Sequence, residues 1–171
     1  MNLLINPNFT QHIPCGGGGQ VFEGWTQEPE CLWMHSGKPN QCENSAAKMG
    51  QDSHANGTVT GWMVGDTGIL YQGVDALDPH TQVTLSTVEI HHMYSGVVEL
   101  TLYGWDGVVW VEIFFRPAPD FPINTPANRT TWYPRSYVIS SEHTRYKVEF
   151  YGQLSEPNDG WKFSCVDVSV S

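Results

Sequence analysis

The segment 97–115 alternates carboxylates with aromatic rings, which are the residue types of a site that binds or cleaves sugars. The candidate residues are Glu99, Thr101, Tyr103, Trp105, Trp110 and Glu112. Rings of this kind stack on pyranose faces, and carboxylates and hydroxyls form hydrogen bonds with sugar hydroxyls. Two carboxylates about 5 Å or about 6.5–9.5 Å apart could instead hydrolyse a glycosidic bond. The six residues are therefore candidates for glycan binding, and Glu99 and Glu112 are also candidates for catalysis.

A β-hairpin is the element that would position these residues. Two runs with period-two alternation flank Asp106-Gly107, a dipeptide that suits a type I′ turn. A two-residue turn predicts three facing pairs on the aromatic side: Tyr103 with Trp110, Thr101 with Glu112, and Glu99 with Phe114. On the other side, Val98, Leu100 and Leu102 would pair with Phe115, Ile113 and Val111.

The two sides of this hairpin differ in composition. The aliphatic side must belong to the core, because a slip of one residue would expose all of its side chains. The aromatic side is too charged for a sealed interior, which leaves two interpretations open. Either another part of the chain covers the rings, or the rings form a recognition surface for a sugar or a protein.

A catalytic role for the two acids has little further support in the sequence. The predicted register makes Glu99 and Glu112 diagonal neighbours, but any two acids on one strand face would meet that condition. The chain has no Gly-x-Ser-x-Gly elbow. We therefore predict a protein that is not an enzyme, with a polysaccharide-active enzyme that uses Glu99 and Glu112 as the alternative.

The rest of the chain predicts an all-β protein. Short apolar runs recur about every ten residues between Gly and Pro turns, and no amphipathic helix is visible, a pattern typical of an antiparallel β-sandwich. The 171 residues fit one domain, residues 1–171. Within it we expect a long irregular loop at about 26–57 and a Pro-rich loop at about 116–134.

Charge and hydropathy exclude two classes of partner. The formal net charge is −10, from 18 acidic residues against 8 Lys and Arg. A surface of this sign repels phosphate backbones and anionic lipids, so we expect neither nucleic acid nor a membrane as a partner. The segment MNLLINPNFT has no basic region and no sustained apolar region, so we expect no signal peptide.

Four cysteines, Cys15, Cys31, Cys42 and Cys165, allow three full disulfide pairings, and the sequence does not choose among them. Three of them lie in the polar segment before residue 50, which would gain most from a covalent link. A zinc site made of Cys15, Cys31, His35 and Cys42 is an alternative, although its spacing matches no paired Cys motif. Free thiols are expected if the protein matures in a reducing compartment.

The two ends of the chain resemble the galactose-binding-like jelly-roll carbohydrate-binding modules. The resemblance rests on the opening Asn2-Leu3-Leu4-Ile5-Asn6-Pro7-Asn8-Phe9, on Gly24-Trp25, and on the closing strands Tyr146–Tyr151 and Val166–Val170. It implies a jelly-roll β-sandwich and a non-catalytic binding module, with a structural calcium ion that Asp167 would help to bind. Thr10 stands where the family often has Glu, which departs from the calcium pattern.

The chain is also similar to modules found on phage virions, in capsid-decoration or tail proteins. This resemblance implies a virion surface component that folds in the host cytoplasm and contacts glycan or neighbouring virion proteins. A homo-oligomer is also a possible assembly of this chain. The alternative is an extracellular location, as the secreted polysaccharide-binding module of a glycoside hydrolase.

Overall fold

The computed structural model describes residues 1–37, 40–53, 59–92, 95–123, 130–157 and 159–171. This part of the chain contains thirteen β-strands and no helix. The strands are β1 (His12–Gly16), β2 (Gly19–Phe22), β3 (Thr26–Glu28), β4 (Met34–Ser36), β5 (Ala46–Ser53), β6 (Val59–Gly61), β7 (Thr67–Asp75), β8 (Gln82–His91), β9 (Val97–Trp105), β10 (Trp110–Arg116), β11 (Tyr133–Ser140), β12 (Arg145–Gln153) and β13 (Gly160–Val170).

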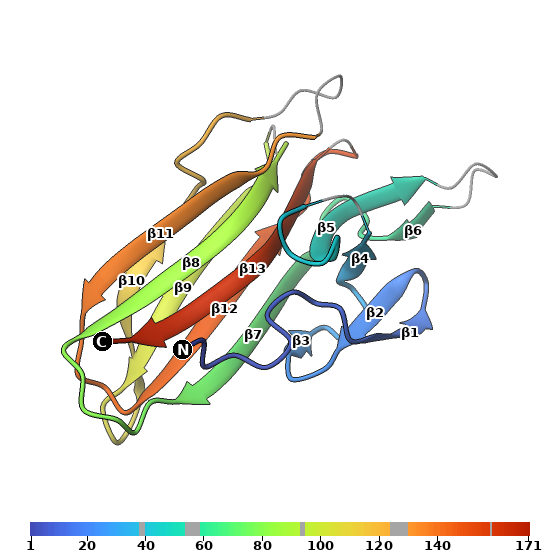
Figure 1. The fold of residues 1–171 in the computed structure, drawn as a ribbon. Helices are drawn as coiled ribbons and strands as arrows, with labels where there is room; N and C mark the ends of the chain where they lie inside the picture. Colours follow the sequence, from blue (N-terminus) through green and yellow to red (C-terminus); the bar gives the residue numbers. More distant parts are fainter. Residues whose placement is uncertain (38–39, 54–58, 93–94, 124–129, 158) are drawn as a thin grey trace.

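Two antiparallel sheets pack face to face. One has the strand order β10-β9-β12-β7-β3, and we call it the back sheet. The other, the front sheet, has the order β11-β8-β13-β5-β4, and β6 pairs with β5. In Figure 1, β8 and β13 lie in front of β9 and β12, while β1 and β2 form a small separate hairpin. The chain is an antiparallel β-sandwich, which confirms the predicted fold class.

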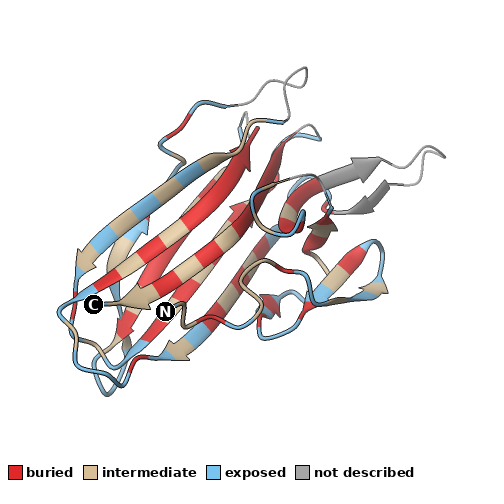
Figure 2. Cartoon of the chain, in the orientation of Figure 1, coloured by how far each residue is buried: buried red, intermediate tan, exposed pale blue. Residues whose placement is uncertain are grey.

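Period-two alternation places one side of each long strand in the core. Figure 2 shows this as buried bands that alternate with less buried ones along the strands of both sheets. In β12, Tyr146, Val148 and Phe150 are buried, as the alternation predicts. Phe150 stacks on Phe163 of β13 with ring centroids 3.8 Å apart, so aromatic contacts join the two sheets directly.

A buried ion pair ties β10 to the front sheet. Glu89 of β8 has no exposed surface, and both of its carboxylate oxygens accept hydrogen bonds of 2.7 Å from Arg116. The Trp161 indole N–H and the Thr87 hydroxyl donate to the same carboxylate over 2.8 and 2.6 Å. Burial alone would lower the pKa of Arg116, but the bonds to Glu89 outweigh burial and raise the pKa.

Two disulfides fasten the polar first third of the chain. Cys15 is bonded to Cys31 and Cys42 to Cys165, so one of the three pairings left open by the sequence is selected. The alternatives of free thiols and of a zinc site made of three cysteines and His35 are wrong, because every thiol is used in a disulfide. The imidazole ring of His35 instead stacks on that of His12, with the two ring centroids 3.9 Å apart.

The prediction of one irregular loop at about 26–57 is wrong. This region contains β3, β4 and β5, which pair with β7 or with one another in the two main sheets. The first two have only three residues each, and short polar strands produce no periodic signal. The described residues of the predicted Pro-rich loop, 117–123 and 130–132, do lie outside any strand.

No helix long and apolar enough to cross a bilayer occurs among the described residues.

Candidate functional site

The six predicted site residues lie on one side of the back sheet. In β9 the residues Val98, Leu100 and Leu102 enter the core, so Glu99, Thr101, Tyr103 and Trp105 face outward. On β10, Trp110 is the Cα partner of Trp105 and Glu112 is the partner of Tyr103, so both share that outer side. The hairpin therefore brings the six residues to one face, with the aliphatic side of β9 in the core as predicted.

The register of this hairpin differs from the prediction. Four residues, from Asp106 to Val109, connect the strands instead of two, because one carboxylate oxygen of Asp106 accepts hydrogen bonds of 2.8 Å from the N–H groups of both Val108 and Val109. These backbone donors, Val109 first and then Val108, lower the pKa of Asp106. The predicted facing pairs Tyr103 with Trp110, Thr101 with Glu112 and Glu99 with Phe114 are therefore wrong.

A β-bulge between Glu112 and Phe114 changes the second half of β10 further. Phe114 faces Leu102 and packs on Tyr137 of β11 at 4.6 Å, while Phe115 faces Thr101 and is 43% exposed. The predicted pairs of Val98, Leu100 and Leu102 with Phe115, Ile113 and Val111 are wrong, because Leu100 has Arg116 and Leu102 has Phe114 as its partner. Val111 is 39% exposed as well. Ile113 is half-buried and packs against the core, as predicted.

The corrected register also separates the two candidate catalytic acids. Glu112 lies beside Tyr103, and Glu99 is four residues further along β9. At about 3.4 Å per residue, their backbones are roughly 14 Å apart along the strand. The prediction that they are diagonal neighbours is wrong, and their spacing does not match the carboxylate pair of a glycosidase.

Strand β12 adds charged side chains that the hairpin sequence did not include. It lies directly beside β9, with Lys147 opposite Tyr103 and Glu149 opposite Thr101. The Lys147 ammonium lies 4.3 Å from the Tyr103 ring centroid, 5.7 Å from that of Trp110 and 3.2 Å from a Glu149 carboxylate oxygen. The outward position of Lys147 could be predicted from alternation, but not its neighbours, because strand order is a long-range property.

A second cation lies beside the tryptophan pair. The Arg145 guanidinium carbon is 5.9 Å from the Trp105 ring centroid and 5.7 Å from that of Trp110, and its Nε is 2.9 Å from a carboxylate oxygen of Asp75. The two indole rings meet edge to face, with centroids 5.3 Å apart. The rings are thus held by cation–π and ring contacts before any ligand binds.

We call this surface the aromatic face, and define it by Tyr71, Glu99, Tyr103, Trp105, Trp110, Glu112, Arg145, Lys147 and Glu149. Burial first, and the negative charge of Glu149 second, raise the pKa of Tyr103, so its hydroxyl stays protonated and can donate a hydrogen bond. Tyr103, Trp105 and Trp110 are all partly exposed, and a cation lies against each ring, Lys147 on Tyr103 and Arg145 on both indoles. The three rings therefore keep surface that a ligand can reach.

Thr101 is less accessible than the sequence predicts. It points to the outer side of β9, but only 5% of its surface is exposed, because it lies between Phe115 of β10 and Glu149 of β12. A ligand on the aromatic face therefore cannot reach the Thr101 side chain. Thr101 packs between its neighbours on this face instead.

Asp167, the predicted calcium ligand, lies in β13 on the other sheet. One of its carboxylate oxygens accepts a hydrogen bond of 2.7 Å from the Ser169 hydroxyl. Among the described residues, no group of three or more His, Cys, Asp or Glu side chains could hold a metal ion. Asn2, from the chain's first segment, bonds the backbone of β13 through both atoms of its side-chain amide. Calcium binding stays an untested prediction.

Comparisons with known proteins agree with the fold. No protein-family model and no curated protein matches this sequence. The structure of TmCBM61 in complex with β-1,4-galactotriose is similar with a TM-score of 0.63 and 13% identity, covering 100% of this chain and 99% of that one. A family 16 carbohydrate-binding module is similar with a TM-score of 0.58 and 12% identity, over 98% of this chain and 99% of that one.

A third similar structure is the enzymatically active domain of tailspike protein 4 of bacteriophage CBA120. The TM-score is 0.60 and the identity 11%, and the match covers 99% of this chain but 21% of that one. At such low identities these similarities establish the fold alone. The chain has the jelly-roll β-sandwich fold of carbohydrate-binding modules.

Proposed function

We propose that this protein is a non-catalytic carbohydrate-binding module and that a glycan lies on the aromatic face. The observation that carries the proposal is the pair of half-exposed indoles, Trp105 and Trp110, on an outer sheet surface that also presents carboxylates, a phenol and two cations. Ring stacking supplies the apolar part of sugar recognition, and the polar groups around the rings can satisfy the sugar hydroxyls.

Pre-organisation supports this function. Lys147 and Arg145 each contact a carboxylate and at least two rings, so little side-chain entropy remains to be lost when a ligand binds. The aromatic face has more carboxylates than cations, which favours a neutral glycan over a polyanionic one. The likeness of the fold to carbohydrate-binding modules supports the same conclusion.

The proposed setting is outside the reducing cytoplasm, on a virion surface or as an extracellular module. Two disulfides favour an oxidising environment, which both locations provide. The similarity to a phage tailspike domain supports the virion surface, where the glycan would be a host surface polysaccharide and neighbouring virion proteins would be the protein partners.

Removal of one indole tests the proposal. Trp110→Ala should weaken retention in an affinity gel that contains a bound polysaccharide by at least about 30-fold, the effect of one binding hot spot. The melting temperature should fall by less than about 4 °C, since the ring is half-exposed. The polysaccharides to screen are β-1,4-linked galactan, mannan, xylan and glucan, each at fixed concentration in the gel.

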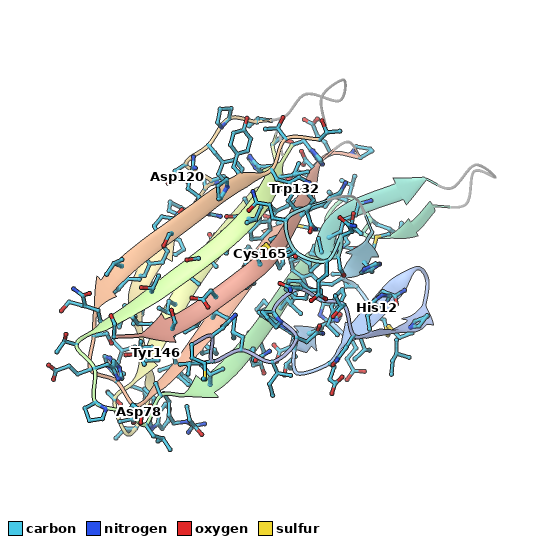
Figure 3. The ribbon with its side chains drawn as sticks, in the orientation of Figure 1. His12, Asp78, Asp120, Trp132, Tyr146 and Cys165 are labelled. Atoms are coloured by element: carbon cyan, nitrogen blue, oxygen red, sulfur yellow. A yellow bond between two sulfur atoms is a disulfide. The ribbon has the colours of Figure 1, made fainter. Side chains whose placement is uncertain are left out.

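Trp132→Ala is the matched control, because Trp132 is another half-exposed indole. Figure 3 places Trp132 toward the opposite end of the molecule from Tyr146, a β12 neighbour of the aromatic face. This control should keep full retention. Equal losses for the two variants, or full retention of Trp110→Ala, would contradict binding at the aromatic face.

A further inference from the structure

The β-bulge in β10 decides which of two consecutive phenylalanines points away from the core. In a regular strand every second side chain lies on the same side, so Trp110, Glu112 and Phe114 would share the outer side of β10. The bulge between Glu112 and Phe114 adds one residue and reverses the alternation. Phe114 therefore turns inward, where its ring packs on that of Tyr137, and Phe115 turns outward.

The neighbours of Phe115 agree with this orientation. Its Cα partner is Thr101, which points to the outer side of β9. The next residue, Arg116, is the partner of the core residue Leu100 and reaches the front sheet, where it binds Glu89. Phe115 is 43% exposed, so its ring adds open apolar surface to the aromatic face. Bulges are common where a strand has to re-aim a side chain at a site.

The Phe115 ring lies further along the hairpin than the two indoles. Trp110 and its partner Trp105 form one row of rings across β10 and β9. Phe115 belongs to the row of Thr101, which is four residues from Trp105 along β9. At about 3.4 Å per residue, the two rows are roughly 14 Å apart. One pyranose ring cannot reach both rows, whereas a chain of several sugar residues can.

The surface between these two rows is polar. Glu112 of β10 faces Tyr103 of β9, and Lys147 of β12 lies on the other side of Tyr103. Glu112 is exposed, and the Tyr103 hydroxyl donates to a Glu149 carboxylate oxygen over 3.5 Å. Along the two strands, indole rings are therefore followed by donors and acceptors and then by the Phe115 ring. This order suits a sugar chain that stacks at two places and forms hydrogen bonds between them.

Tyr71 is another ring in the same row as Phe115, but it is further from the indoles. It faces Glu149 from β7, which is three strands from β10 in the back sheet. At about 4.8 Å per strand, it lies roughly 14 Å from Phe115 across the sheet. The Lys147 ammonium also lies 5.5 Å from the Tyr71 ring centroid. Phe115 is therefore the nearer ring for a chain that starts at Trp110.

We infer that Phe115 is a second stacking platform and that the glycan runs along β9 and β10 from the indole pair to Phe115. The ligand is then a neutral oligosaccharide segment of about three or more residues, because the platforms are roughly 14 Å apart. This inference rests on the proposed function, since it assigns the length and direction of the ligand on the same surface.

Titration with oligosaccharides of increasing length tests this inference. The probes are β-1,4-linked galacto-, manno-, xylo- and cello-oligosaccharides of two and of four residues. The wild-type protein should bind the longer member of at least one series more tightly. Phe115→Leu should remove this gain and weaken the four-residue ligand about 2–12-fold, the amount by which ring contacts exceed apolar burial. The affinity for the two-residue ligand should not change.

Two further variants separate stacking from an effect on folding. Phe115→Trp keeps a ring at this position and should keep the gain with length. Val111→Ala alters a β10 side chain that is 39% exposed but faces Gly104 on the other side of the hairpin, so both affinities should be unchanged. The melting temperature of Phe115→Leu should fall by less than about 4 °C, because the ring is half-exposed.

The outcomes distinguish this inference from the proposed function. A gain with length that survives in Phe115→Leu would overturn the inference, and its loss in Tyr71→Leu would show a chain that crosses the sheet instead. Equal weakening of both ligands by Phe115→Leu would also overturn it. In these cases Trp110→Ala still weakens binding, and the proposed function stands. Binding of no oligosaccharide, with no retention on any polysaccharide, would contradict the proposed function and this inference together.

Discussion

At the scale of single residues, the candidate site depends on which side chains are left half-exposed. Trp105 and Trp110 could be selected from the sequence, because alternation separates them from Leu100 and Leu102. The burial of Thr101 could not be predicted from the sequence, because it depends on Phe115 of β10 and Glu149 of β12, which lie on either side of it. The same holds for Lys147, whose contact with Tyr103 arises from strand order.

His91 gives a prediction about the dependence of stability on pH. Burial first, with an opposing effect of Glu89 and a further lowering by Arg116, brings its pKa to about 4, below the ordinary value of 6.5. Between pH 6.5 and 4 the unfolded chain therefore binds a proton that the folded chain does not. The free energy of unfolding should fall by about 2 kcal/mol as the pH drops through this window.

Urea unfolding at pH 7.5, 6 and 4.5 measures this effect. His91→Gln should remove most of the loss that occurs between pH 6.5 and 4, because Gln does not titrate. The same pH dependence in His91→Gln as in the wild-type protein would show that another group is responsible.

At the scale of elements, strand existence could be predicted more readily than strand pairing. The run from Val108 to Phe115 is apolar apart from Glu112 and fits either register, so the sequence does not reveal that Asp106 widens the turn or that a bulge follows Glu112. The strands β3 and β4 escaped prediction because each has only three residues, too few to show an alternation, and β3 pairs with the distant strand β7.

The ion pair that joins β10 to β8 gives a prediction at this scale. Glu89→Ala would leave the Arg116 guanidinium buried without its partner and should lower the free energy of unfolding by about 3–5 kcal/mol. Asp75→Ala removes the partner of Arg145 in an ion pair whose side chains are 51% and 63% exposed, and should cost at most about 1 kcal/mol.

Chemical denaturation of both variants tests the difference. A loss in Glu89→Ala that is as small as the loss in Asp75→Ala would contradict the contribution of the buried pair to stability. Glu89→Ala combined with Arg116→Met should recover part of the lost stability, because no buried charge then lacks a partner.

At the scale of the whole molecule, the all-β class and the sandwich architecture could be predicted from turn spacing and alternation. The disulfide pairing could not be predicted from the sequence, because it depends on how the first third of the chain folds back on β13. The Cys42–Cys165 bond spans 123 residues and the Cys15–Cys31 bond spans 16. A chain-entropy estimate of their stabilisation is about 5 and about 3 kcal/mol respectively.

Paired Cys→Ser variants test these values. Loss of the Cys42–Cys165 bond should lower the free energy of unfolding by about 2 kcal/mol more than loss of the Cys15–Cys31 bond. Mass spectrometry after alkylation without reduction should first show no free thiol in the wild-type protein. An alkylated cysteine there would contradict the pairing.

Glycan binding at the aromatic face is tested most directly by the indole N–H signals of the seven tryptophans during titration with an oligosaccharide that the affinity gel identifies. Trp105 and Trp110 should shift and saturate together, while the core residues Trp33, Trp62 and Trp161 stay in place. Glycan binding at the aromatic face would be contradicted if only the Trp132 signal shifted. It would also be contradicted if the sugar bound while the signals of both Trp105 and Trp110 stayed in place.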